Sequence, residues 1–273
     1  MSTESRNPRS IGLDRMSARE IVRLMNEEEM AVIRALQHAE EPLAEAALRV
    51  AEAFQAGGKI IYVGSGTSGR VAAMDAAEMP PTFGLDPDRF VAIVSGGTEA
   101  HSKARENAED DEHEAISIIN DLGLERRDVL IGIAASGNTP FVVAAVAHAK
   151  QKGVWTCGIA NNKGTRLLRE ADLGILLDTG PEVLTGSTRL KAGTAQKLAL
   201  NRISTASMVL SGKTISNLMV DVKANNRKLR ERCCRIVQDL TQATFDEAWE
   251  ALEKHNWSVR QAVAILSVAP AKA

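Results

Sequence analysis

The chain has 273 residues, of which 44% are hydrophobic and 25% charged, enough for one large α/β domain with a small appendage. A net charge of −2 argues against a general nucleic-acid or membrane-surface binder. Because aromatic residues make up only 3%, the core must be built from Ala, Val, Leu and Ile, which suits helices packed on a buried sheet.

Two further features bear on the compartment. Residues 1–9 are polar, so no secretory signal is expected, and no apolar run approaches the roughly 18 to 20 residues of a membrane span. The three cysteines, Cys157, Cys233 and Cys234, are odd in number and two are adjacent, which favours free thiols in a reducing compartment. We therefore expect a cytoplasmic protein without a membrane segment.

The first dozen residues are expected to form an arm, and helices are expected between this arm and the first strand. Ser17 and Glu20 have the spacing of a capping box, which predicts a helix start. A second helix is predicted over residues 32–54, ended by the glycines that follow. Together with the sheet described next, these helices form an expected domain over residues 1–232, followed by a small helical module over residues 233–273.

Five short apolar runs rich in β-branched residues alternate with mostly alanine-rich helical segments. This alternation predicts an α/β fold with a doubly wound, five-stranded parallel sheet, and ligands of such sheets bind in the loops beyond the carboxyl ends of the strands. Helices are predicted over residues 190–210 and 222–240, with two short helical patterns between residues 241 and 266. The predicted strands are residues 59–63, 90–94, 129–134, 154–159 and 173–177.

The loop after the first predicted strand, Gly64–Gly69, matches the G-x-G-x-x-G pattern of dinucleotide sites. Such a site needs an acidic residue at the end of the second strand, where this chain has Ser95 followed by two glycines. A helix N-terminus with several hydroxyls suits a phosphate monoester better, although a glycine-rich turn without a ligand is the plainer alternative. The candidate phosphate ligands here are Ser65, Gly66, Thr67 and Ser68.

The third predicted strand ends in a similar loop, Ser136, Gly137, Asn138 and Thr139. Two hydroxyl-lined loops at the switch point of the sheet are expected to converge on one ligand, which we favour over a pair of ordinary helix caps. A third stretch, residues 181–197, is dense in hydroxyls and glycines and includes Glu182, Ser187 and Lys191. It is interpreted as a binding loop, the alternative being a capped helix with a solvated basic face.

Two glutamates are less distinctive on their own. Glu78 precedes a pair of prolines that is expected to end its helix, and desolvation there would give it the raised pKa that a general acid needs. Glu109 lies in the acidic run 106–114, and such a run is usually a solvated helix face. The histidines and cysteines show no metal-ligand spacing, so no metal site is expected.

Taken together, the motifs resemble the N-acetylmuramic acid 6-phosphate etherase family, within the sugar-isomerase (SIS) fold. DAAEMPPTFG and TGSTRLKAGTAQK are long and particular to this family and its sugar-phosphate-binding relatives, whereas GSGTSG alone is not. Many family members have Arg where this chain has Asn138. The matching stretches run from Arg6 to about Leu229: RNPRSIGLDRMS, GSGTSGR, DAAEMPPTFG, SGG, NAED, GIAASGNTP, PEVLTGSTRLKAGTAQKLALN and NLMVDVKANNRKL.

The resemblance implies a lyase that removes D-lactate from N-acetylmuramic acid 6-phosphate by elimination and hydration, giving N-acetylglucosamine 6-phosphate. It assigns the proton donor to Glu78 and the second catalytic glutamate to Glu109. It implies no cofactor, a homodimer, and a small sugar phosphate as the ligand, in cell-wall amino-sugar recycling. The alternatives on the same fold are a sugar-phosphate isomerase and a non-catalytic sugar-phosphate-binding regulator.

Overall fold

The computed structural model describes residues 2–97 and 107–268. Two compact units make up the chain: Met1–Ala77 with Asp88–Ser207, and Glu78–Pro87 with Met208–Ala273. The boundary expected between residues 232 and 233 falls inside a helix of the second unit, Arg227–Thr241. Within the described residues, no helix is long and apolar enough to cross a bilayer.

The first unit opens with an N-terminal arm containing three short 3-10 turns, followed by helices. The predicted capping box is confirmed, because Ser17 accepts from the Glu20 backbone N–H while the Glu20 side chain accepts from that of Ser17. The helix expected over residues 32–54 is instead two helices, because Pro42 has no N–H to donate to the carbonyl four residues back. The elements are η1 (Ser2–Glu4), η2 (Pro8–Ser10), η3 (Leu13–Arg15), α1 (Ala18–Glu28), α2 (Met30–His38) and α3 (Glu40–Gln55).

The predicted five-stranded parallel sheet is confirmed, with strand order β2-β1-β3-β4-β5. The first and third strands are neighbours, as expected, and Gly64 at the end of β1 pairs with Ile133 of β3. Strand order therefore reverses at β1, which makes the edge beyond β1 and β3 the switch point. The strands are β1 (Ile60–Gly64), β2 (Phe90–Val94), β3 (Val129–Ala134), β4 (Trp155–Ala160) and β5 (Leu173–Leu176).

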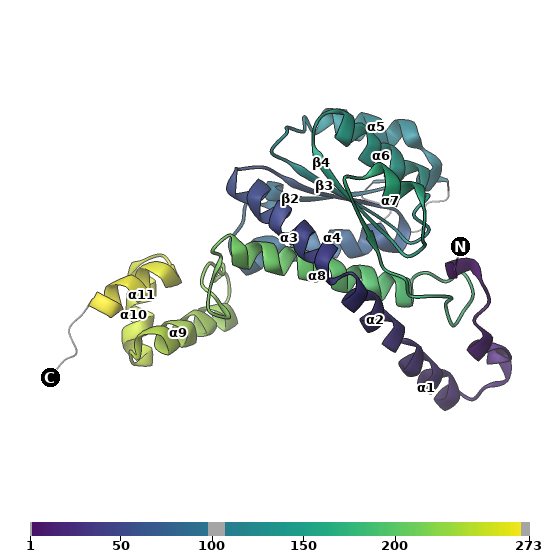
Figure 1. Ribbon diagram of the computed structural model, residues 1–273. Helices are drawn as coiled ribbons and strands as arrows, with labels where there is room; N and C mark the ends of the chain where they lie inside the picture. Colours follow the sequence, from purple (N-terminus) through teal and green to yellow (C-terminus); the bar gives the residue numbers. More distant parts are fainter. Residues whose placement is uncertain (1, 98–106, 269–273) are drawn as a thin grey trace. The chain divides into compact units, whose positions relative to one another are not determined.

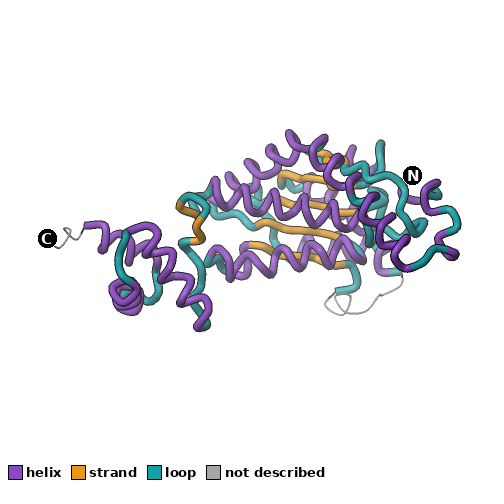
Figure 2. The backbone as a smooth tube through the Cα atoms, turned by 90° about the horizontal axis from the view of Figure 1, so that it is seen from below, coloured by secondary structure: helices purple, strands orange, loops and turns teal. Residues whose placement is uncertain are grey.

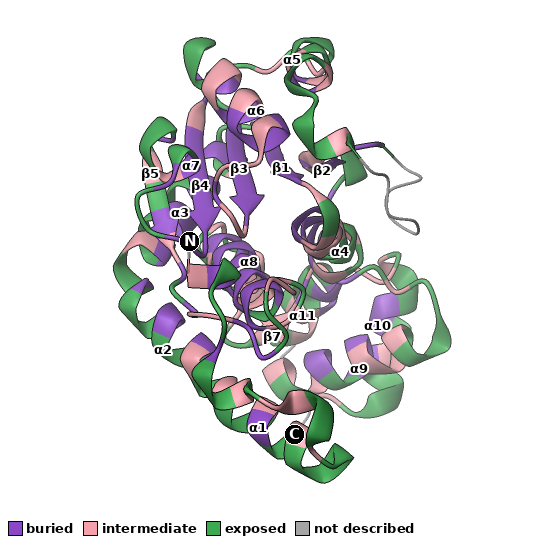
Figure 3. Ribbon diagram, turned by 90° about the vertical axis from the view of Figure 1, so that its right-hand side faces the viewer, coloured by how far each residue is buried: buried purple, intermediate pink, exposed green. Residues whose placement is uncertain are grey.

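Helices cover both faces of this sheet (Figures 1 and 2). On one face lie α5 (Glu112–Asp121), α6 (Pro140–Gln151) and α7 (Arg166–Glu170), where Ile61 and Val63 of β1 join a core with Phe141. On the other lie α3, α4 (Gly66–Phe83) and α8 (Lys191–Leu210). The central strands are buried along their whole length (Figure 3), as both-face coverage requires.

A polar cluster joins β1, α4 and α8 on the second face. The buried carboxylate of Asp75 on α4 accepts from Tyr62 Oη at 3.1 Å, Asn201 Nδ2 at 2.7 Å and Ser204 Oγ at 3.2 Å. Burial raises the pKa of Asp75 above its usual value despite these three donors. Since all four groups are partnered, the cluster joins three elements without an unpaired buried group.

The second unit is a small helical module. Its hairpin strands are β6 (Thr214–Ile215) and β7 (Leu218–Met219), and its helices are α9 (Arg227–Thr241), α10 (Phe245–Lys254) and α11 (Val259–Val268). The start predicted for α9, residue 222, is wrong, because Asn226 accepts from the Leu229 backbone N–H and caps the helix there. Cys233 and Cys234 are free and buried in this core, as is Cys157 in the sheet.

Candidate active site

The loop between β1 and α4 carries the first set of predicted phosphate ligands. Gly66 has φ +54°, and a Cβ added at Gly69 would lie 2.7 Å from the Gly64 carbonyl oxygen, so α4 starts in close contact with the strand. The first N–H groups of this helix have no partners within the helix and favour an anion. Ser68 is 7% exposed. Thr67 is half-buried.

The hydroxyl of Ser65 is the most informative atom of this loop. Its Oγ is buried and has no hydrogen-bond partner among the residues that the structure describes. A buried polar atom without a partner costs about 1 to 3 kcal/mol, a cost that a ligand oxygen at this position would remove. The orphan hydroxyl therefore distinguishes the loop from a simple glycine-rich turn.

The loop between β3 and α6 carries the second set. Ser136 Oγ and Thr139 Oγ1 lie 3.3 Å apart, and Ser136 Oγ also accepts from the Asn138 backbone N–H at 3.2 Å. Gly137 has φ +67° and leaves no room for a side chain, since an added Cβ would lie 2.3 Å from Thr165 Oγ1. Asn138 Oδ1 accepts from the Arg166 backbone N–H at 3.1 Å and so fastens the loop to the start of α7.

The two loops follow neighbouring strands, so they meet at the same edge of the sheet. The N-terminal end of α8 joins them there, because a Cβ added at Gly193 would lie 3.1 Å from Thr67 Cγ2. The structure thus brings three of the predicted binding segments together at the switch point. Backbone amides and hydroxyls of this kind can hold a phosphate monoester.

The segment before α8 contains Glu182, which sequence reasoning placed at the substrate. The residue is 0% exposed, and its two carboxylate oxygens accept from the backbone N–H groups of Lys191 at 3.0 Å and Ala192 at 2.9 Å. Burial raises the pKa of Glu182, and the two N–H donors act in the opposite direction. Glu182, nine residues before Lys191, therefore caps the N-terminal end of α8.

Lys191 also has a partner within the protein. Its Nζ donates to Glu28 Oε2 at 2.6 Å, and Glu28 accepts in addition from Asn7 Nδ2 at 2.7 Å and from Arg9 at 2.9 Å. Burial alone would raise the pKa of Glu28, but the hydrogen bonds from Lys191, Asn7 and Arg9 hold it below its ordinary value. Ser187, in the same segment, is half-buried and donates its backbone N–H to the Leu184 carbonyl at 2.9 Å.

Glu109 lies in a 3-10 turn, η6 (Ala108–Asp110), and not on the helix α5 that carries Glu112. η6 packs against α6. The far ends of α5 and α6 are joined by His148 Nε2 and Asn120 Oδ1, 2.9 Å apart, so the two helices run in the same direction. Glu109 therefore lies near the N-terminal end of α6, which follows Thr139 at the carboxyl edge of the sheet. Its side chain is exposed.

Glu78 lies on α4, in the segment Glu78–Pro87 that belongs to the second unit. Its side chain is exposed, so the expected desolvation is wrong, because Met79 and not Glu78 takes the buried position on this turn. The expected helix end is wrong too. α4 continues through Pro80 and Pro81 to Phe83, although neither proline can donate an N–H to the helix.

Sequence reasoning missed the loop after β4. Thr165 Oγ1 is buried beside Gly137 and, like Ser65, has no hydrogen-bond partner in the described part of the chain. The signal was available, because Asn161–Thr165 follows its strand with polar residues and a glycine as the two recognised loops do. Within residues 2–97 and 107–268, no three His, Cys, Asp or Glu side chains gather as metal ligands would.

Comparison with known proteins shows which family models match the region that carries these loops. Two family models match, "Glucokinase regulatory protein N-terminal SIS domain" over residues 42–150 and "SIS domain" over residues 111–205. Among solved structures, the phosphoheptose isomerase of Neisseria gonorrhoeae is 25% identical with a TM-score of 0.53, covering 70% of this chain and 99% of that chain. That of Francisella tularensis is 20% identical with a TM-score of 0.54, covering 72% and 100%. These likenesses show the SIS fold.

Curated relatives are similar over nearly the whole length. The N-acetylmuramic acid 6-phosphate etherase of Geobacillus thermodenitrificans is 48% identical over 97% of this chain and 90% of its own. That of Oceanobacillus iheyensis is 46% identical with the same coverage of both chains. With this identity across both units, the chain belongs to the N-acetylmuramic acid 6-phosphate etherase family.

Proposed function

We propose that this protein is a carbon–oxygen lyase that cleaves the lactyl ether of N-acetylmuramic acid 6-phosphate, giving N-acetylglucosamine 6-phosphate and D-lactate. The observation that carries the proposal is the convergence of two hydroxyl loops at the switch point, with the buried hydroxyl of Ser65 lacking a partner within the described residues. The near-full-length similarity to etherases identifies which sugar phosphate such a site would take.

The phosphate would be held by hydroxyls and backbone amides of the two loops. Its ligands in this proposal are Ser65, Gly66, Thr67, Ser68, Ser136, Gly137, Asn138 and Thr139. Glu182 and Lys191 support the site by fixing the start of α8 against Thr67, since their own polar groups are partnered within the protein. Ser187 would contact the sugar from the same segment.

The chemistry requires two carboxyl groups. Opening of the sugar ring exposes an aldehyde at C1, which makes the C2 proton acidic. One glutamate removes this proton, the C3–O bond breaks, and a carboxylic acid protonates the departing lactate oxygen. Water then adds across the C2–C3 double bond, its proton going to C2 and its hydroxyl to C3. Glu78 is proposed as the acid and Glu109 as the second catalytic group, and no metal or redox cofactor is required.

Release of D-lactate from N-acetylmuramic acid 6-phosphate tests the proposal directly. Glu78→Gln and Glu109→Gln should each lower kcat by about 10² to 10⁴, as loss of a general acid or base does. Glu112→Gln is the matched control, because this residue lies in the same acidic run but on α5. In D₂O the product should carry deuterium at C2. If Glu109→Gln proves as mild as Glu112→Gln, Glu109 is not catalytic.

The two alternatives make different predictions. A sugar-phosphate isomerase would interconvert aldose and ketose phosphates and release no lactate. A regulator would bind the sugar phosphate without turnover. Neither alternative is favoured, because the similarity to etherases covers both units of the chain and not the SIS region alone.

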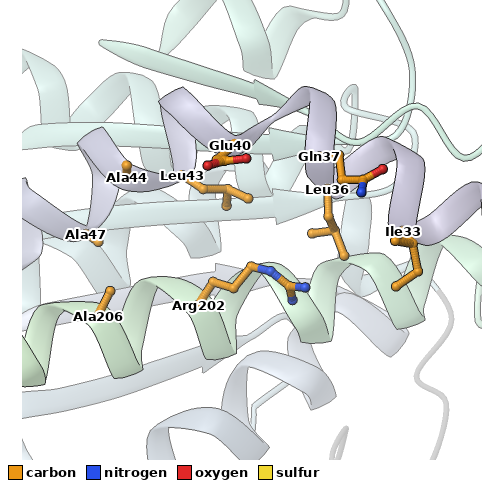
Figure 4. Close-up of a pocket in the computed structure, with 9 residues that line it drawn as sticks. All are labelled: Ile33, Leu36, Gln37, Glu40, Leu43, Ala44, Ala47, Arg202 and Ala206. Atoms are coloured by element: carbon orange, nitrogen blue, oxygen red, sulfur yellow. The ribbon is translucent and has the colours of Figure 1, made fainter. Parts of the chain in front are cut away.

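The active protein is proposed to be a cytoplasmic homodimer acting in cell-wall amino-sugar recycling. A groove of about 410 Å³ lies between α2, α3 and α8 (Figure 4), and most of its lining is apolar. Met30 on α2 and Leu48 on α3 are 54% and 51% exposed, and exposed apolar side chains that extend an apolar groove are typical of a protein–protein interface. Ile33→Glu in this groove should shift sedimentation from dimer to a 29.3 kDa monomer, whereas Glu41→Gln on α3 should not. The groove lining is Ile33, Leu36, Gln37, Glu40, Leu43, Ala44, Ala47, Arg202 and Ala206.

A further inference from the structure

The N-terminal arm is built into the edge of the sheet where the candidate site lies. Thr3 is 0% exposed and its backbone N–H donates to Asn162 Oδ1 at 3.2 Å. The Asn162 side chain in turn donates to Thr3 Oγ1 and to the Ala135 carbonyl, both at 2.9 Å. The arm therefore contacts the segments that follow β3 and β4 (Figure 3).

Further along, the arm is fixed to the segment that precedes α8. Asn7 is 4% exposed, and its Nδ2 donates to Glu28 Oε2 at 2.7 Å and to the Pro181 carbonyl at 3.3 Å. Between the arm and residues 183–185 lies a cavity of about 460 Å³. Residues 183–185 of its lining directly follow Glu182, whose carboxylate caps α8, and Gly193 near the start of α8 lies against Thr67 of the first phosphate loop.

Arg6 is the cation available in this cavity. The neighbouring Arg9 is paired with Glu27 and Glu28, and the guanidinium of Arg15 lies against Gly12. Arg6 is exposed, lines the cavity, and forms no ion pair with any residue that the structure describes. Ser10 and Thr185 are part of the same lining, and the Ser10 hydroxyl donates to the Asn7 carbonyl at 3.2 Å.

A guanidinium can bind a carboxylate through two parallel N–H···O hydrogen bonds, and neighbouring hydroxyls can donate further bonds to it. The proposed substrate carries two acidic groups on separate substituents, the phosphate on the C6 oxygen and the lactyl carboxylate on the C3 oxygen. Since the hydroxyl loops take the phosphate, a second anion site is needed elsewhere on the same edge. We infer that the cavity between the N-terminal arm and residues 183–185 is a carboxylate subsite in which Arg6 binds the lactyl group of the substrate.

The subsite rests on the proposed function and explains its specificity. Sugar 6-phosphates without a lactyl ether share the phosphate but leave Arg6 without a partner. Asp14 also lines the cavity and repels a carboxylate there. Substitutions of Arg6 and Asp14 should therefore change the affinity for the substrate in opposite directions and leave the affinity for sugar phosphates without a lactyl group unchanged.

The test compares the substrate with the product, which has lost the lactyl group. Arg6→Ala should raise KM for N-acetylmuramic acid 6-phosphate about 10- to 100-fold, the range for one hydrogen-bonded ionic contact. The inhibition constant of N-acetylglucosamine 6-phosphate should stay unchanged. Arg6→Lys should be intermediate, and Asp14→Asn should lower KM about 2-fold or more. Arg19→Ala, an exposed arginine on α1, is the matched control.

Two results would overturn the inference. If Arg6→Ala weakens substrate and product equally, the residue acts on the shared phosphate or on the fold of the arm. If neither changes, Arg6 does not touch the ligand. Should the wild-type protein release no lactate, the proposed function fails. Calorimetric titration of the same two sugar phosphates into wild type and Arg6→Ala then tests the subsite separately.

Discussion

The loop after β1 and the segment before α8 have similar compositions, rich in hydroxyls and glycines, yet the structure uses them differently. In the β1 loop the Ser65 hydroxyl has no partner in the described chain. In the segment that leads into α8, Glu182 accepts from the backbone N–H groups of Lys191 and Ala192. Lys191, the first residue of α8, donates its ammonium group to Glu28. The comparison teaches that composition alone does not distinguish a binding loop from a segment whose polar groups stabilise the fold.

The largest effect on folding is expected at Glu182. Glu182→Ala removes an acceptor from two buried N–H groups and leaves a cavity, so the free energy of unfolding should fall by about 2 to 4 kcal/mol. Urea denaturation measures this change. Glu182→Gln, which keeps one acceptor oxygen, should cost less. Equal stability of Glu182→Ala and wild type would show that the segment is not a cap, and the comparison above would fail.

A somewhat smaller effect is expected at the ion pair. Lys191→Met keeps the apolar stem but leaves Glu28 with only Asn7 and Arg9, so stability at pH 7 should fall by about 1 to 3 kcal/mol. Because the folded pKa of Glu28 is lowered, its contribution is present above the unfolded value of about 4.5 and is lost as pH falls through the folded pKa. The acid-induced loss of stability should therefore be shallower in Lys191→Met, which denaturation at pH 7 and pH 3 can determine.

In the β1 loop the effect should appear in binding. Ser68→Ala should weaken affinity for the sugar phosphate by about 1 to 3 kcal/mol, the range for a hydrogen bond to a charged group. Stability should hardly change. Equal affinity of N-acetylmuramic acid with and without its phosphate would contradict the assignment of this loop.

The smallest effect on stability is expected at Ser65, and it tests most directly whether the β1 loop serves a ligand or the fold. Ser65→Ala removes a buried hydroxyl that has no protein partner among the described residues, so the free protein should be unchanged or more stable by a few tenths of a kcal/mol. Stabilisation by a saturating sugar phosphate should nevertheless decrease, as thermal shift would show. A clear destabilisation of the free protein would mean that Ser65 serves the fold.

Local pattern was sufficient for the sheet, because each buried strand is a continuous apolar run such as Val129–Ala134 and the order of elements limits the topology. Local pattern was insufficient for helix boundaries that a single residue determines. Pro42 divides a helix that composition alone makes continuous, and Asn226 delays the start of α9.

The roles of site residues were harder to predict for a different reason. The partner of Lys191 is Glu28, 163 residues away in sequence, and no local pattern identifies it. The catalytic assignments of Glu78 and Glu109 came from family resemblance and stay predictions, since both side chains are exposed in the chain on its own. The two loops at the switch point, by contrast, followed from strand order alone.

The Asp75 cluster has a consequence for amide hydrogen exchange. Its hydrogen bonds join α4 to β1 and to residues of α8 that lie 126 and 129 positions away. Elements tied through one buried carboxylate open together, so amides of β1, the first half of α4 and the middle of α8 should exchange with a common opening free energy. Replacing Asp75 by Ala would uncouple them, and α8 amides would then exchange ahead of those in β1.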